Sequence, residues 1–213
     1  MPDFDDAYFV KICGVTSLGD ANAAIDAGAN AIGLNLATSS RHLSLDRALA
    51  IAEATRGRVL RTLIFYDNDD AFIVDAVDLI DADVAQIHGS LSDELLDQLR
   101  QRDVRIIKAL SIGTDEFYGF NDGSVDAVMV DGATPGSGES HSWDELFGRT
   151  FVVPVIAAGG LDDANVASVI EVTGVWGVDS ASGVESTPGV KDRDRMSHFI
   201  ANAQAAFRER GTP

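Results

Sequence analysis

Eight short apolar segments, rich in β-branched and aromatic residues, recur along this 213-residue chain with helix-like segments between them. Such strict alternation favours parallel strands joined by right-handed crossovers in an α/β fold. Eight units at a spacing of roughly 25 residues predict a single (β/α)8 barrel, the TIM-barrel fold, over residues 1–213. The predicted strands cover residues 8–12, 31–36, 59–66, 83–87, 104–110, 126–130, 151–157 and 175–179.

The intervening segments have the spacing of amphipathic helices. They cover residues 17–29, 44–55, 69–80, 92–102, 162–173 and 192–210, with shorter helices expected near 112–122 and 139–148. The alternative architecture is an open, doubly wound sheet, but no G-x-G-x-x-G motif follows the first strand to support a dinucleotide site. No linker rich in Pro, Gly or Ser divides the chain, which favours one domain.

The formal net charge is −18, from 34 acidic and 16 basic residues. Nucleic acid is therefore not an expected partner, because phosphate backbones require basic patches. The simplest interpretation of the acidity is a solvated acidic surface. A sharper hypothesis is adaptation to a salt-rich cytoplasm, since salt screens self-repulsion and proteins of extreme halophiles are similarly rich in Asp and poor in Lys.

The chain has no feature that predicts export or a membrane partner. No apolar run approaches the ~18 residues of a membrane span. The first residues, MPDFDDAYF, lack the basic-then-apolar order of a signal peptide. We therefore expect a cytoplasmic protein with no membrane partner.

Barrels of this type carry their active sites where strands end and loops begin, so the residues at those junctions are the candidates. Cys13, the single cysteine, ends the first strand and shares a strand face with Lys11. It has no disulfide partner, and it is either a small buried thiol or a thiolate acting as base or nucleophile. Asp131 directly follows the sixth strand and is either a turn aspartate ahead of Gly132 or a catalytic carboxyl.

Two further polar residues follow strands two and four. Arg41, in the segment TSSRHLS, is either an ordinary surface arginine or a clamp for an anion. His88, in QIHG, is either a hydrogen-bonded structural histidine or a group that shuttles protons or contacts a substrate.

Glycine-rich turns follow the last two strands, and their bare backbone N–H groups favour an anion. They contain Gly159 and Gly160 after strand seven, and Ser182 and Gly183 after strand eight. Because this pair of loops is the recurrent phosphate site of the fold, a phosphorylated small molecule is the expected ligand. The sequence lacks G-x-S-x-G, P-loop and H-E-x-x-H motifs, and its four histidines are scattered, so we expect neither metal nor cofactor.

The ordered segments VKICGVT, NAIGLNLATSSRHLS, AQIHG, VDGATPGSGESHSW, VIAAGGLDDANV and GVDSASGVESTPGVKD resemble the phosphoribosylanthranilate isomerase family of tryptophan biosynthesis. The resemblance runs from about Val10 to Phe199. It implies an Amadori rearrangement of an aminoaldose phosphate to an aminoketose phosphate, without a cofactor.

The resemblance also assigns roles residue by residue. It makes Cys13 the general base and Asp131 the general acid, which must begin as a thiolate and a protonated carboxyl, respectively. Arg41 would hold the anthranilate carboxylate. Gly159, Gly160, Ser182 and Gly183 would hold the phosphate, and His88 falls in the family's Gln-Leu-His-Gly element, with Ile87 in place of Leu.

Two departures from the family pattern affect loops. Ser39-Ser40-Arg41 replaces Ser-Pro-Arg, which makes that loop less rigid, and HSW at 141–143 replaces Phe-Asp-Trp beside the PGSG loop, a candidate lid. Lys11 either assists the thiolate or, more simply, neutralises an acid inside the barrel.

Two rival functions are open. One is the isomerase of the histidine pathway, which uses a carboxylate where this chain has Cys13; the other is a phosphometabolite-binding barrel without activity. The oligomeric state is not predictable from the sequence.

Overall fold

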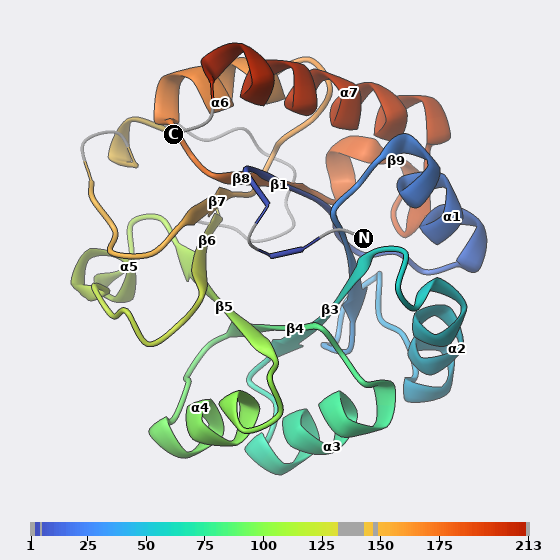
Figure 1. The fold of residues 1–213 in the computed structure, drawn as a ribbon, viewed down its shortest axis with the longest axis vertical. Helices are drawn as coiled ribbons and strands as arrows, with labels where there is room; N and C mark the ends of the chain where they lie inside the picture. The colour runs from blue at the N-terminus through green and yellow to red at the C-terminus, as the bar shows by residue number, and fades with distance from the viewer. Residues whose placement is uncertain (1–2, 5, 132–142, 147–148, 212–213) are drawn as a thin grey trace.

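The computed structural model describes residues 3–4, 6–131, 143–146 and 149–211. Its eight parallel strands form a closed barrel in which each strand pairs with the next and β8 pairs with β1. The helices lie outside the ring of strands (Figure 1). The predicted (β/α)8 barrel is therefore confirmed.

The elements fall close to the predicted segments. The barrel strands are β1 (Phe9–Ile12), β2 (Ala31–Asn35), β3 (Leu60–Tyr66), β4 (Val84–His88), β5 (Arg105–Ser111), β6 (Ala127–Asp131), β7 (Val155–Ala157) and β8 (Gly177–Ser180). The α-helices are α1 (Leu18–Ala27), α2 (Leu45–Thr55), α3 (Asp70–Ile80), α4 (Asp93–Arg100), α5 (Asp115–Gly119), α6 (Val166–Thr173) and α7 (Arg193–Arg210). Two 3₁₀ turns are η1 (Trp143–Glu145) and η2 (Ser182–Val184).

Side-chain caps fix where several helices begin. Ser17 accepts a hydrogen bond from the Asp20 amide at the start of α1, and Ser92 accepts one from the Leu95 amide at the start of α4. Asp192 caps α7 in the same way. These bonds satisfy amides that have no partner within the first helical turn.

Two boundaries differ from the predicted ones for local reasons. The seventh strand was expected from residue 151 but begins at Val155, just after Pro154, which has no N–H to donate to a ladder. The helix expected from residue 162 begins at Val166, because Asp162 accepts hydrogen bonds from the amides of Ala164 and Asn165 and holds a turn there.

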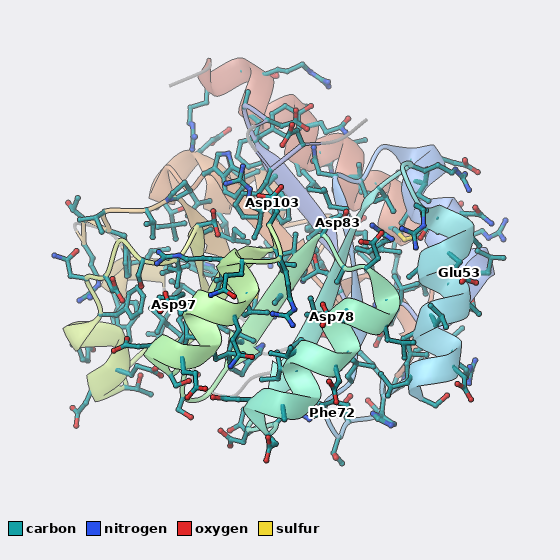
Figure 2. The ribbon with its side chains drawn as sticks, turned by 60° about the horizontal axis from the view of Figure 1, so that its bottom comes forward. Glu53, Phe72, Asp78, Asp83, Asp97 and Asp103 are labelled. Atoms are coloured by element: carbon teal, nitrogen blue, oxygen red, sulfur yellow. The ribbon has the colours of Figure 1, made fainter. Side chains whose placement is uncertain are left out.

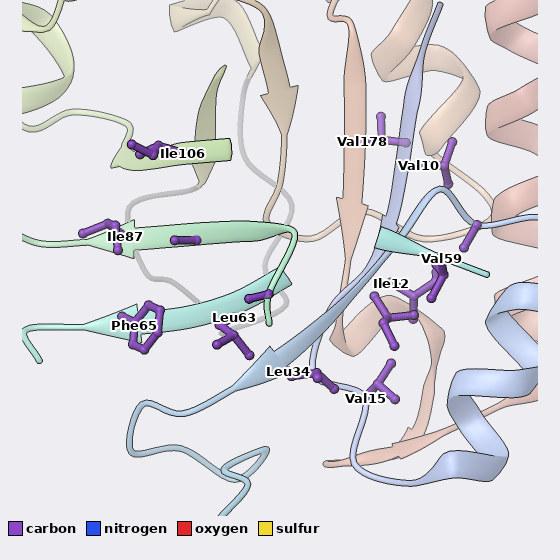
Figure 3. Close-up of a cluster of buried hydrophobic side chains, with 14 of the residues drawn as sticks. Val10, Ile12, Val15, Leu34, Val59, Leu63, Phe65, Ile87, Ile106 and Val178 are labelled. Atoms are coloured by element: carbon purple, nitrogen blue, oxygen red, sulfur yellow. The ribbon is translucent and has the colours of Figure 1, made fainter. Parts of the chain in front are cut away.

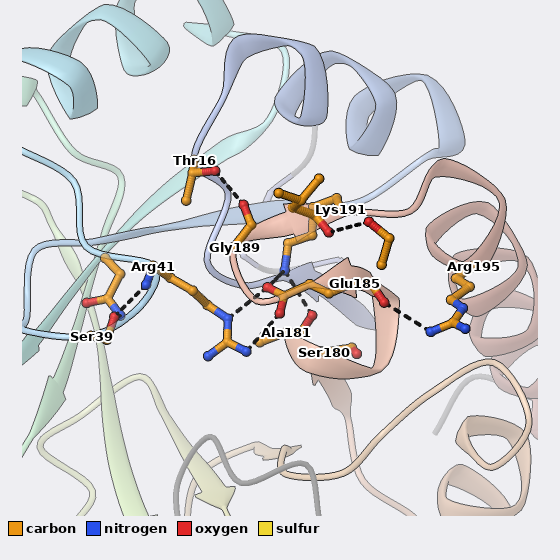
Figure 4. A network of polar contacts seen from close by, with 12 residues as sticks. Thr16, Ser39, Arg41, Ser180, Ala181, Glu185, Gly189, Lys191 and Arg195 are labelled. Carbon is orange, nitrogen blue, oxygen red and sulfur yellow. Dashed lines mark hydrogen bonds and ion pairs between the residues drawn. The ribbon is translucent and has the colours of Figure 1, made fainter.

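A short antiparallel hairpin after β8 was not predicted. It pairs β9 (Glu185–Thr187) with β10 (Val190–Lys191) across a turn that contains Pro188 and Gly189. Pro followed by a Gly with positive φ, here 82°, is typical of a tight turn. The hairpin places Glu185 and Lys191 beside the carboxyl ends of the barrel strands (Figure 4).

The larger apolar core lies between the strands and the surrounding helices. Side chains such as Val10, Ile12, Leu63 and Phe65 point away from the barrel axis into this layer (Figure 3). Their neighbours along each strand point into the barrel, because successive strand residues alternate between faces.

A second cluster fills the barrel interior at the amino-terminal ends of the strands. It contains Phe9, Leu60, Val84, Ile107 and Ile156 among others. Phe4, Phe9 and Trp176 pack as a trio of aromatic rings with centroids 5.1–5.4 Å apart. Higher along β1 the interior becomes polar at Lys11, which leaves the carboxyl end of the barrel for a polar site.

The outer faces of the helices carry much of the acidity. Glu53, Asp78 and Asp97 are exposed on α2, α3 and α4 (Figure 2). This placement agrees with the interpretation of the charge as a solvated acidic surface. None of the described helices is long and apolar enough to cross a membrane. The candidate lid at PGSG lies outside the described residues.

Candidate active site

A cavity of about 500 Å³ opens at the carboxyl ends of the strands. Seven of the eight predicted site residues line it: Cys13, Arg41, His88, Asp131, Gly159, Gly160 and Ser182. Residues that the sequence did not single out line it too, among them Asn35, Tyr66, Gln86, Asp179 and Ser180. The strand ends therefore bring together side chains that are widely separated in sequence, as expected for this fold.

Cys13 stands above a buried ion pair. The Lys11 Nζ lies 2.7 Å from Asp179 Oδ1 on β8, and both side chains are almost completely buried. Burial alone would lower the pKa of Lys11, but the charges and hydrogen bonds of Asp179 and Cys13 together outweigh that effect and raise it. Lys11 therefore stays charged and neutralises Asp179 inside the barrel, which is the second of the two interpretations that the sequence allowed.

The protonation state of Cys13 differs from the expected one. Burial raises the pKa of the thiol, and the nearby charge of Lys11 opposes this rise without cancelling it. The thiol therefore predominates at neutral pH, whereas the sequence led us to expect a thiolate. Lys11, Lys191 and Arg41 all favour the thiolate electrostatically, and Asp179 disfavours it.

Asp131 is the last residue of β6, and only 8% of its surface is exposed to solvent. Its backbone is fixed against β5, because Ser111 of β5 pairs with it and its carbonyl accepts from the Ile112 amide at 2.9 Å. Cys13 and Asp131 thus reach one cavity from opposite parts of the barrel, a prerequisite for their roles as base and acid.

His88, at the end of β4, is held as a neutral imidazole. The Gln86 side-chain nitrogen lies 2.9 Å from His88 Nε2, which must accept because an amide nitrogen only donates. Burial, followed by the charges of Lys11 and Lys108, lowers the pKa of His88 to about 4. The ring also packs against Tyr66, with centroids 5.9 Å apart.

Arg41 forms a bidentate ion pair with the carboxylate of Glu185. Its Nε lies 2.8 Å from Glu185 Oε1, and its Nη2 lies 2.9 Å from Oε2 (Figure 4). Lys191 Nζ also donates to Glu185 Oε1 at 2.9 Å. Burial alone would raise the pKa of Glu185, but the hydrogen bonds from Arg41 and the charge of Lys191 lower it. The cluster of two cations and one anion carries a net positive charge.

The two glycine loops meet at the cavity. Gly159, Gly160 and Ser182 line it, but Gly183 does not appear in its wall. A Cβ added to Gly183 would lie 2.0 Å from the Leu161 carbonyl oxygen, so this glycine allows the two loops to pack closely. Gly183 thus serves the site through loop packing.

Metal ligation finds no support in the described part of the chain, where no group of three or more His, Cys, Asp or Glu side chains is placed to hold an ion.

Comparison with known proteins identifies the family. Residues 10–202 match the family model described as N-(5'-phosphoribosyl)anthranilate (PRA) isomerase. The chain belongs to this family. A PRA isomerase of Bradyrhizobium sp. (strain ORS 278) is 35% identical to it over 94% of this chain and 97% of the relative.

Solved PRA isomerases share the fold at similar identity. The Thermotoga maritima enzyme matches with a TM-score of 0.81 and 30% identity, over 93% of this chain and 99% of that one. A PRA isomerase solved in complex with reduced 1-(o-carboxyphenylamino)-1-deoxyribulose 5-phosphate matches with a TM-score of 0.76 and 28% identity, over 93% and 99% of the two chains.

Sequence reasoning did not assign roles to several residues that the structure places in or beside the cavity. Glu185, Lys191 and Asp179 all fall within the segment GVDSASGVESTPGVKD, which carried part of the family resemblance. The sequence pattern that could have revealed them is a charged residue in the same segment as the glycines of the phosphate loop. Gln86 lies two residues before His88 and is 1% exposed, a pattern that strand alternation could have revealed.

Proposed function

We propose that the chain catalyses the Amadori rearrangement of N-(5'-phosphoribosyl)anthranilate to 1-(2-carboxyphenylamino)-1-deoxyribulose 5-phosphate. The observation that carries this proposal is that Cys13 and Asp131 line one cavity together with Arg41 and two glycine loops. A volume of about 500 Å³ falls within the range of ~300–1,000 Å³ typical of small-molecule sites.

In this proposal the two ends of the substrate are held by different groups. The phosphate lies against Gly159, Gly160 and Ser182, whose loops offer backbone N–H groups. The carboxylate of the anthranilate ring binds Arg41, whose guanidinium carries donors beyond those used by Glu185. His88 is neutral through burial, and its Nε2 faces Gln86, so in this proposal it donates from Nδ1 to a polar substrate group.

Chemistry then proceeds by two proton transfers on one substrate. Asp131 gives a proton to the furanose ring oxygen, which opens the ring to a protonated Schiff base. The fraction of Cys13 present as thiolate removes the proton from carbon 2, and the resulting enolamine tautomerises to the ketone. Lys11 supports this step, because its buried ammonium lies below Cys13 and favours the thiolate.

Turnover of synthetic phosphoribosylanthranilate, followed by the loss of its fluorescence, tests the proposal. Cys13→Ser and Asp131→Asn should each lower kcat by ~10²–10⁴-fold, the usual contribution of a proton-transfer group. Gly160→Asp should raise KM strongly, since it sets a negative charge against the phosphate. Wild-type kcat in the Cys13→Ser variant at pH 7 would show that the base lies elsewhere.

Three further parts of the proposal follow from the sequence. The acidic surface is an adaptation to a salt-rich cytoplasm, and residues 1–213 act as one domain without a nucleic-acid or membrane partner. A melting temperature that rises between low salt and molar KCl would support the first part, because screening relieves self-repulsion. A melting temperature that stays flat would contradict it.

A further inference from the structure

We propose that Glu185 is a positioning residue that fixes the plane of the Arg41 guanidinium and turns one edge of it toward the substrate carboxylate. The inference rests on the proposed function and deepens it, because it names the residue that sets selectivity for a carboxylate-bearing substrate.

The geometry divides the guanidinium into an occupied edge and an open one. Glu185 accepts from Nε and Nη2 of Arg41 at 2.8 and 2.9 Å, and so takes the side edge of the fork. A guanidinium has five N–H donors, so the two on Nη1 and the second on Nη2 remain. Nη1 and Nη2 together form the end edge, which matches a second carboxylate in a bidentate arrangement.

Glu185 is itself held at three points. Lys191 Nζ donates to its Oε1 at 2.9 Å, Arg195 Nη1 donates to its backbone carbonyl at 3.0 Å, and the β9–β10 pairing fixes its strand (Figure 4). Its side chain is 4% exposed and that of Lys191 is 0% exposed. A carboxylate gripped in this way has little freedom to move when a second anion arrives.

The stem of Arg41 is fixed as firmly as its head. It crosses Gly14, where an added Cβ would lie 2.3 Å from Arg41 Cδ. The Gly14 backbone also has φ of +66°, a conformation that favours glycine. The Arg41 amide donates to Ser39 Oγ at 3.0 Å. The arginine is therefore already ordered in the folded protein, so substrate binding does not have to supply the entropy cost of ordering it.

The network also resolves an electrostatic conflict. An arginine alone beside Lys191 would repel it, and an arginine neutralised by one carboxylate would offer no net attraction. The cluster pairs the two basic side chains of Arg41 and Lys191 with the single carboxylate of Glu185, in a chain whose net charge is −18. Glu185 thus orients the arginine, and Lys191 preserves the attraction for an anion.

The experiment compares kcat/KM for phosphoribosylanthranilate with kcat/KM for phosphoribosylaniline, which lacks the ring carboxylate. Each variant is judged by the ratio of these two values, because the ratio is independent of the fraction of protein that folds. In Glu185→Gln we expect the ratio to fall roughly 10–100-fold, since misplacement of a binding group by ~1 Å can cost about 10²-fold. The loss should be in KM for the anthranilate substrate, with kcat within about twofold.

Two matched variants separate positioning from general damage to the hairpin. Ser186→Ala removes an exposed hydrogen bond to the Val190 carbonyl on the same hairpin and should leave the ratio unchanged. In an Arg41→Ala background, Glu185→Gln should cause no further fall, because a residue that acts through Arg41 has nothing left to position. Losses that multiply in the double variant would overturn the inference.

A third variant covers the case in which Glu185→Gln does not fold. Arg41→Lys leaves the Glu185–Lys191 pair in place but removes the planar fork, so the ratio should fall by about tenfold or more. An unchanged ratio in Arg41→Lys would show that a point charge suffices and would also overturn the inference. Failure of the proposed function looks different: Arg41→Ala would then lower both substrates equally, or the wild type would turn over neither.

Discussion

The free energy of unfolding should decrease as the pH falls below neutrality, and part of that decrease should disappear when His88 is replaced. Folding lowers the pKa of this imidazole from 6.5 to about 4, through burial first and then the charges of Lys11 and Lys108. Between these two pH values the unfolded chain binds a proton that the folded chain does not. The contribution of neutral His88 is therefore complete above pH 6.5 and is lost as the pH falls toward 4.

The magnitude follows from the two pKa values. One pKa unit corresponds to about 1.36 kcal/mol, so His88 should account for about 2 kcal/mol of the decrease in unfolding free energy between pH 7.5 and pH 5. By pH 4 the same calculation gives about 3 kcal/mol. Geometry supports the direction, because a proton on His88 Nε2 would face the amide nitrogen of Gln86 at 2.9 Å.

Urea denaturation at pH 7.5 and pH 5, at constant ionic strength, measures the effect in wild type and in His88→Asn. The variant should be less stable than wild type at pH 7.5 because it loses the packing against Tyr66, but its stability should fall by about 2 kcal/mol less on acidification. His198→Asn is the matched control, since the same substitution then removes an exposed histidine on α7 in place of a buried one. Parallel losses in wild type and His88→Asn would refute the reasoning.

Three other predictions concern the same cavity. Burial raises the pKa of the Cys13 thiol, so the rate of its alkylation by iodoacetamide should keep rising with pH beyond the range in which an ordinary cysteine titrates. The value of kcat/KM should rise with pH in the same range, and a plateau of either quantity reached by pH 7 would contradict the prediction. Gly14→Ala should destabilise the protein and raise KM together, since it strains the backbone and displaces Arg41, whereas Gly57→Ala, with no atom within 4 Å, supplies a control for positive φ alone. Gly183→Ala should weaken phosphate binding by displacing the strand-seven loop from its contact at Leu161, and a variant that binds inorganic phosphate as wild type does would exclude that role.

The fold was predictable because its signals are local. Alternation of strand and helix segments, with Ser or Asp before several helices, is enough to place the elements and closes into one barrel. The errors at Pro154 and Asp162 have equally local causes, since one residue lacks a donor and the other holds a turn in place of a helical start.

The site was predictable where a residue at a strand end, or in the loop directly after it, is of a type that suits the chemistry. Cys13, His88 and Asp131 end strands, so strand assignment alone placed them at the cavity. Glu185 was not predictable, because its importance comes from Arg41, which is 144 positions away and is met only after the barrel closes. The protonation state of Cys13 was also out of reach, because it depends most on burial, then on Lys11, and also on Asp179, which lies far away in the sequence.

The aromatic trio at the amino-terminal end of the barrel limits the route by which substrate can enter the cavity and product can leave it. Phe4, Phe9 and Trp176, with the inner cluster above them, fill the barrel interior of the described chain up to the Lys11–Asp179 pair. Substrate and product must then share the mouth at the carboxyl end, and a departing product vacates the space that the next substrate enters. Product should therefore act as a purely competitive inhibitor. The strength of its phosphate and carboxylate contacts should set the rate at which it dissociates and frees the cavity.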